Sequence, residues 1–225
     1  MDRNVYSLVL LDDVVDAVDK LAYERSTSRS GLINQILADY LSCPIPENRI
    51  RDIFTCMEKM FAGMDGFQLR DPPSDSMISI RSALHYRYRP TVRYALELYR
   101  KCEPYVGELR VSFRTQNEEL LGLSEEFFRF WNSLETQWIG NRFRGGHIPC
   151  SIDPGRYSRQ LQCSRAEEEQ TNERIARAIL LYIREFDSAM KKYVCGPDGT
   201  EKTEREIEGE YLDYLKKAMI KAMIL

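Results

Sequence analysis

Within the first forty-odd residues, the spacing of the apolar side chains changes from a strand period to a helix period. Residues 5–10 form a short apolar run of strand length with β-branched and aromatic members. Residues 12–24 then carry apolar side chains at helical spacing, behind two aspartates that suit the positive end of a helix dipole. After a serine-rich turn, Ser28 is a good N-cap for a second helix that ends near Leu41. The order strand, helix, helix is therefore predicted.

The run Cys43-Pro44-Ile45-Pro46 ends this segment, because two prolines in three residues disfavour a helix. We expect one domain over residues 1–44 and a second over residues 47–225. A strand-helix-helix unit of this size is too small to bury its own apolar faces. The first domain should therefore need a partner, and a second copy of the chain would supply one.

The second domain is predicted to combine a short antiparallel sheet with helices. A helix is expected over about 47–60, a half-buried strand over 77–89 and a further strand over 109–113. Residues 92–98 fit a return strand, although part of their spacing also fits a helix. The rest of the chain is expected to be helical, so the fold class is α+β, mainly α with a small β part. The expected core stripes are Leu120, Leu123, Phe127, Trp131, Leu134 and Trp138, then Ile175, Ile179, Tyr182, Phe186, Ala189 and Tyr193, then Ile207, Tyr211, Leu215, Ala218 and Ala222.

Composition is that of a globular protein, with 43% hydrophobic and 30% charged residues. No apolar run is long enough to span a bilayer, and the first residues do not resemble a signal peptide, so a cytoplasmic location with no membrane partner is expected. The six cysteines are far apart and form no Cys-x-x-Cys pair, which indicates free thiols. The net charge of -3 gives the whole chain no general attraction for nucleic acid, so any such attraction must be local.

The first domain resembles the ribbon-helix-helix family of DNA-binding proteins, of the Arc, MetJ and CopG type. The resemblance rests on the segments Tyr6–Leu10, Ala17–Ala22 and Ser28–Ile33, together with Tyr40-Leu41, and covers about residues 4–42. It implies a dimer in which two copies of the strand pair as an antiparallel ribbon that enters the major groove of double-stranded DNA. The chain would then be a sequence-specific transcriptional regulator, a repressor, that acts as a homodimer or a dimer of dimers on a palindromic or repeated operator.

Carried over by position, this resemblance assigns a role to each polar or outward residue of the first domain. Tyr6, Leu8 and Leu10 would pack on the helices, while Ser28 and Ser30 would hold a phosphate at the start of the second helix. The full set of implied DNA-binding residues is Arg3, Asn4, Val5, Ser7, Val9, Ser28, Arg29 and Ser30.

Two features depart from the family pattern. Valine at positions 5 and 9 can contact only a thymine methyl, whereas base edges are read by hydrogen bonds. Residues 1–44 also contain four basic side chains against seven acidic ones. An alternative therefore stays open, in which this domain is a protein-protein dimerisation, scaffold or plasmid-maintenance (antitoxin) module.

The predicted sheet of the second domain has a basic face. Its members are Arg81, His85, Arg87, Arg89, Arg93, Arg110 and Arg114. Guanidinium groups pair with phosphate, so this is a candidate anion or nucleic-acid face. A solvated face whose arginines pair with Glu97 and Glu108 would have the same sequence.

No nucleophile-base pair, Walker loop, dinucleotide fingerprint or metal-ligand spacing is present, so no enzyme activity, cofactor or metal is expected. His147 and Cys150 are ligand-capable, but further ligands at recognisable spacing are lacking. The second domain is expected to sense an effector, bind a protein partner or join dimers along DNA. An enzymatic role for it is the third and least supported hypothesis.

Overall fold

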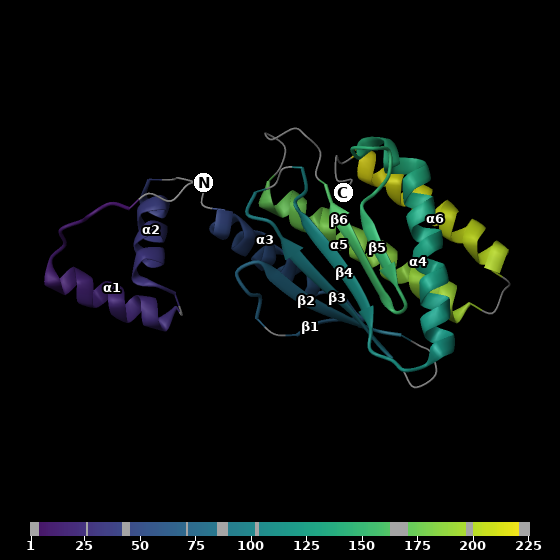
Figure 1. The fold of residues 1–225 in the computed structure, drawn as a ribbon, viewed down its shortest axis with the longest axis horizontal. Coiled ribbons are helices and arrows are strands. Elements are labelled where there is room, and N and C mark those ends of the chain that lie inside the picture. The colour runs from purple at the N-terminus through teal and green to yellow at the C-terminus, as the bar shows by residue number, and fades with distance from the viewer. Residues whose placement is uncertain are drawn as a thin grey trace. The chain divides into compact units, whose positions relative to one another are not determined.

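The structure, a computed structural model, describes residues 5–25, 27–41, 46–70, 72–84, 90–101, 104–162, 171–196 and 200–220. The chain divides into two compact units, the N-terminal unit Met1–Asn48 and the C-terminal unit Arg49–Leu225 (Figure 1). Each unit is described by itself. Across the described residues, no helix combines the length and the apolar character that crossing a membrane requires.

Two helices make up most of the N-terminal unit, α1 (Asp12–Glu24) and α2 (Arg29–Tyr40). Helix α2 begins where expected because the Ser28 side chain accepts a hydrogen bond from the Gly31 N–H at 3.1 Å. The buried core of the unit consists of Val18, Ala22 and Leu32, with Leu21 and Ile33 packed against it. Both predicted helices are therefore confirmed.

The strand predicted over residues 5–10 is not formed within the chain. Residues 5–11 belong to no helix or strand, and the backbone enters α1 extended, with φ -70° and ψ 144° at Leu11. A β-strand needs a neighbour to accept and donate its backbone hydrogen bonds. No described strand of the same chain pairs with this segment, so the prediction of a strand is wrong for a single copy.

The C-terminal unit is an antiparallel sheet with helices on one face (Figure 1). The strands are β1 (Phe67–Leu69), β2 (Met77–Ala83), β3 (Thr91–Leu98), β4 (Gly107–Phe113), β5 (Cys150–Asp153) and β6 (Arg156–Leu161). Their order in the sheet is β1-β2-β3-β4-β6-β5, with every neighbouring pair antiparallel. The helices are α3 (Pro46–Phe61), α4 (Glu118–Ile139), α5 (Asn172–Cys195) and α6 (Thr200–Ile220), and a 3-10 turn, Gly140–Arg142, follows α4.

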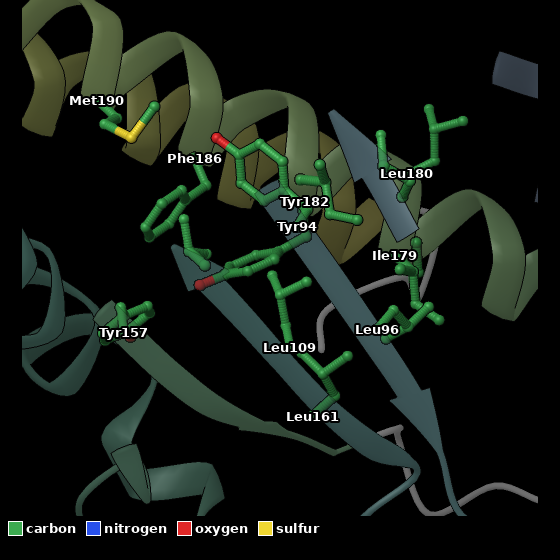
Figure 2. Close-up of a cluster of buried hydrophobic side chains, with 14 of the residues drawn as sticks. Tyr94, Leu96, Leu109, Tyr157, Leu161, Ile179, Leu180, Tyr182, Phe186 and Met190 are labelled. Atoms are coloured by element: carbon green, nitrogen blue, oxygen red, sulfur yellow. The ribbon is translucent and has the colours of Figure 1, made fainter. Parts of the chain in front are cut away.

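The core of this unit lies between the sheet and its helices. Phe186 of α5 packs against aromatic rings of three other elements, with ring centroids 5.3 Å from Phe127 and Trp131 of α4, 5.5 Å from Tyr157 of β6 and 6.3 Å from Tyr94 of β3. Figure 2 shows α5 lying across the strands, with Phe186, Tyr94 and Tyr157 among the labelled side chains of this core. The described members of the predicted stripes of α4, α5 and α6 therefore face the core, except that Trp138 is 40% exposed; Ala222 lies outside the described residues.

Most of the expected elements of this unit are confirmed and two are corrected. The α+β class, α3, β2, β4 and the three long helices are confirmed, and residues 91–98 form a strand rather than a helix. The helical expectation is wrong for residues 150–161, which form the hairpin β5–β6 and enlarge the short sheet to six strands. The strand expected to reach residue 89 ends at Ala83, and residues 85–89 lie outside the described residues.

Candidate functional site

The segment before α1 exposes apolar side chains in an alternating pattern. Val5 and Val9 are fully exposed, at 100% and 102%, whereas Leu8 is 61% and Leu10 is 41% exposed. Ser7 lies between the valines and is also exposed. Even-numbered side chains therefore lie closer to the unit than odd-numbered ones, which is the alternation of an extended chain with two faces. Arg3 and Asn4, the other residues predicted for this site, lie outside the described residues.

The start of α2 holds the three residues predicted to contact phosphate. Ser28 is used as the N-cap, and Ser30 is exposed. Arg29 forms a two-pronged ion pair with Asp19 of α1: its Nε donates to Oδ1 at 2.5 Å and its Nη2 contacts Oδ2. The hydrogen bond from Arg29 lowers the pKa of the Asp19 carboxyl. The Asp19 carboxylate thus already binds the Arg29 guanidinium, which by the resemblance would contact DNA.

Further apolar side chains on the two helices of the N-terminal unit are exposed. Val14 is 43%, Ile36 44% and Leu37 46% exposed, and Leu41 is 63% exposed. Monomeric proteins rarely expose apolar side chains in such density beside an equally apolar segment. This unit therefore has more apolar surface than its own three-residue core can cover.

The C-terminal unit has a polar sheet surface, which we call the open face. It consists of the sheet residues that alternate with the buried ones, and none of its described members is buried. Register places Arg81 opposite Arg93, Arg93 opposite Ser112, and Ser112 opposite Arg156. Three arginines therefore lie in one row across β2, β3, β4 and β6, which we call the arginine row.

The predicted basic face is only partly brought together. Arg81 and Arg93 lie in the arginine row, Arg114 is exposed just after β4, and Arg87 and Arg89 lie outside the described residues, as does His85. Arg110 is taken up by two carboxylates: its Nε donates to Glu108 at 2.6 Å and its Nη2 contacts Glu97. The hydrogen bond to Glu108 raises the pKa of Arg110. Arg110 thus fits the alternative interpretation, in which the arginines of a solvated face pair with Glu97 and Glu108.

A buried ion pair lies in the core and was not predicted. Arg159 of β6 and Glu135 of α4 are both fully buried and pair through two contacts of 3.0 Å. The Tyr182 hydroxyl donates to Glu135 at 3.1 Å and accepts from the Trp131 indole N–H at 3.1 Å. Burial raises the pKa of the Glu135 carboxyl, and the Arg159 guanidinium opposes that shift. With every group engaged and no exposure, this cluster stabilises the core and offers no access to a substrate.

A second buried cluster joins α5 to β2 and β3. Asp187 accepts from the Tyr94 hydroxyl at 2.8 Å and from the Ser82 hydroxyl at 3.1 Å. Lys191 lies 2.6 Å from Asp187 and donates to Ser82 at 2.7 Å. A serine next to a lysine can be a nucleophile-base pair, but here both side chains are bound to the Asp187 carboxylate. Ser82 is also buried, so a substrate cannot reach it. The cluster therefore has a structural role, in which it links α5 to β2 and β3.

The two ligand-capable residues noted in the sequence, His147 and Cys150, are not part of a metal site. His147 is exposed and its Nδ1 lies 3.1 Å from the Gly145 carbonyl oxygen, while Cys150 is half-buried in β5. Over the part of the chain that the structure describes, no three histidine, cysteine or carboxylate side chains are grouped to hold a metal. Neither this pair nor the buried clusters therefore offers a metal or nucleophile site in the described residues.

A scan against protein-family models, a search of curated proteins and a search of solved structures each found no match to this chain.

Proposed function

We propose that this chain is a dimeric, DNA-binding transcriptional regulator in which residues 5–10 of two copies pair as an antiparallel ribbon. The observation that carries the proposal is the exposed, almost wholly apolar segment that precedes α1 and belongs to no helix or strand of its own chain. An extended apolar strand without a neighbour is a template for pairing with another strand. A second copy of the same segment is the neighbour that is always available.

The alternation of exposure along this segment supports the orientation of such a ribbon. Leu8 and Leu10, the less exposed side chains, lie on the face of the segment that would pack on the helices of the dimer. The opposite face of the segment, which would enter the major groove, carries Val5, Ser7 and Val9. Dimerisation would also cover the apolar side chains left exposed on α2, such as Ile36 and Leu37.

Backbone anchoring by α2 is the second part of the proposal. Free N–H groups at the start of a helix and the positive end of its dipole suit a phosphate, and Ser30 stands exposed there. Arg29 would exchange Asp19 for a phosphate, which is feasible because the two side chains are 55% and 43% exposed. An exposed ion pair of this kind is worth little, so DNA phosphate can displace it.

A second candidate function is a protein-protein dimerisation or antitoxin module. The apolar outward residues Val5 and Val9 and the engagement of Arg29 by Asp19 favour it. Both functions share the dimer and differ in whether the ribbon contacts DNA.

The test is a salt titration of binding between the full-length chain and the DNA upstream of its own coding sequence. Wild type is compared with Arg29→Gln and with Arg129→Gln, a control that removes an exposed, carboxylate-paired arginine from α4 in the other unit. Loss of one phosphate contact in each copy of the dimer should weaken binding and lower the log-log salt slope by about 1.8 in Arg29→Gln alone. A dimer of wild-type chain that shows no preference for this DNA would favour the dimerisation module instead.

A further inference from the structure

We infer that the open face of the C-terminal unit is a second contact surface for duplex nucleic acid, which binds the phosphate backbone through the arginine row. This inference concerns a surface separate from the ribbon. It rests on the proposed function only in that both would act on the same DNA.

The arginine row is unusual because like charges are placed directly opposite one another. Arg81 of β2 and Arg93 of β3 are register partners, so their β-carbons lie about 5 Å apart on the same face. Like charges at this position destabilise a sheet. A bound anion removes that cost, and three guanidiniums in one row can share the phosphates of a polyanion.

The carboxylates of the open face are placed away from the middle of this row. Glu97 and Glu108 are register partners that lie beyond Arg110, on the side away from the arginine row, and both bind Arg110. Asp153 stands at the end of the row, opposite Arg156, and accepts from Ser151 at 3.4 Å. No ion pair joins a described carboxylate to any member of the arginine row. These guanidiniums are therefore the cations of the open face that remain available to a ligand.

Small hydroxyl side chains surround the arginine row and can donate to phosphate oxygens. Arg93 Nε donates to Ser79 at 3.0 Å, which fixes the plane of its guanidinium. Ser112 lies between Arg93 and Arg156, and Ser158 follows on β6. Hydroxyls and guanidiniums together are the usual contacts to a nucleic-acid backbone.

The composition of the open face favours a duplex over two other occupants. A single strand is held by stacking its bases on aromatic rings, and no aromatic side chain lies among the described strand residues of this face, while Tyr99, just after β3, has its hydroxyl bound to Gln160 at 3.1 Å. A stable interface between two copies needs an apolar centre, whereas this face has serine, arginine and glutamate there. The row crosses three strand spacings, or about 14 Å, a length over which a duplex presents several phosphates.

The experiment measures binding of the full-length chain to a random-sequence duplex by fluorescence anisotropy over a series of salt concentrations. Wild type is compared with the triple variant Arg81→Gln, Arg93→Gln and Arg156→Gln. The matched control is Arg129→Gln, Arg177→Gln and Arg205→Gln, which makes the same change in net charge at exposed, carboxylate-paired arginines of α4, α5 and α6. Thermal melting of all three proteins establishes that they are folded, and the single variant Arg93→Gln serves if the triple variant is not.

Loss of the arginine row should lower the log-log salt slope by about 2 to 3, at about 0.9 for each phosphate contact, while the control keeps the wild-type slope. The single Arg93→Gln variant should lose about 0.9. Equal losses in variant and control, equal slopes in all proteins, or no binding of the random duplex by wild type would each overturn the inference. A change of molecular mass in the triple variant, with its slope unchanged, would overturn it in favour of a second copy on this face.

Failure of this inference can be told apart from failure of the proposed function. The proposed function requires that wild type prefers its own upstream DNA over the random duplex, and that Ser7→Ala reduces this preference. The open face has no part in that preference. A triple variant with a reduced slope on the random duplex, in a protein without sequence preference, would keep the open-face site and reject the regulator.

Discussion

Three buried apolar residues form the core of the N-terminal unit, whereas the core of the C-terminal unit takes side chains from four helices and most strands of its sheet. The N-terminal unit leaves Val5, Val9 and Leu41 largely exposed. The C-terminal unit has enough interior to bury even the ion pair of Arg159 and Glu135. The difference indicates that the second unit has a core of its own, while the first leaves apolar surface that the proposed second copy would cover.

The largest expected effect is alkaline unfolding of the C-terminal unit. Tyr94, Tyr157, Tyr182 and Tyr211 are buried, and burial raises the pKa of each above its ordinary value of 10. The unfolded chain loses these protons near pH 10 and the folded unit does not, so stability is complete below pH 10 and falls above it. Four such groups cost about 5 kcal/mol of unfolding free energy for each further pH unit.

The measurement follows tyrosinate absorbance and near-ultraviolet circular dichroism together as pH rises. Both should change in one cooperative step, because the buried hydroxyls ionise only when the unit unfolds. The described tyrosines of the N-terminal unit, Tyr6, Tyr23 and Tyr40, are at least 80% exposed and are not part of this buried set. Gradual ionisation of all tyrosines with the dichroism unchanged would contradict the claim that ionisation of the buried tyrosines requires the C-terminal unit to unfold.

The next effect tests the buried ion pair. Glu135→Leu leaves the Arg159 guanidinium buried without its carboxylate, which should cost about 3 to 5 kcal/mol of unfolding free energy. Replacing both residues, Glu135→Leu with Arg159→Met, should recover most of this loss. Both tryptophans of the chain, Trp131 and Trp138, are in α4, so tryptophan fluorescence in a urea titration reports on the C-terminal unit alone. A double variant no more stable than the single one would show that the pair is not coupled.

A smaller effect tests whether the N-terminal unit is completed by a second copy. Leu8→Ser removes an apolar side chain from the face that would pack on the helices, which should cost about 2 kcal/mol for each copy. Val9→Ser also replaces an apolar side chain with serine, but on the opposite face of the segment, and should leave the dimer intact. Light scattering coupled to gel filtration measures the mass of each variant. Equal masses for the two variants across a dilution series would reject the two-faced ribbon.

The two units also differ in how far their structure could be predicted from sequence. The helices of the N-terminal unit follow from local signals such as the Ser28 cap. The proposed ribbon would pair two chains. The sequence of one chain therefore predicts the two faces of the segment but cannot show the strand that pairs with it. For the candidate site, sequence placed Arg81 and Arg93 on one face, but only the register adds Arg156 to them.

The hairpin β5–β6 was missed for a physical reason. Arg159 occupies a core position between Tyr157 and Leu161, so a charged residue interrupts the alternation that identifies a half-buried strand. Its partner Glu135 is 24 residues away on another element, and no local pattern connects them. The turn Asp153-Pro154-Gly155 was the available signal, since Gly155 takes a positive φ of 69°.

The smallest effect we predict concerns the cap of α2, where the N-terminal unit depends on a local hydrogen bond rather than on a core. Ser28→Ala removes the acceptor of the Gly31 N–H and should destabilise the start of α2 by about 1 kcal/mol. Amide hydrogen exchange at Gly31 should then be about fivefold faster. Ser30→Ala, which leaves the cap in place, is the matched control and should change this rate little. If the two variants exchange alike, the start of α2 is held by packing in the dimer, and the contrast between the units is smaller than the exposed surface indicates.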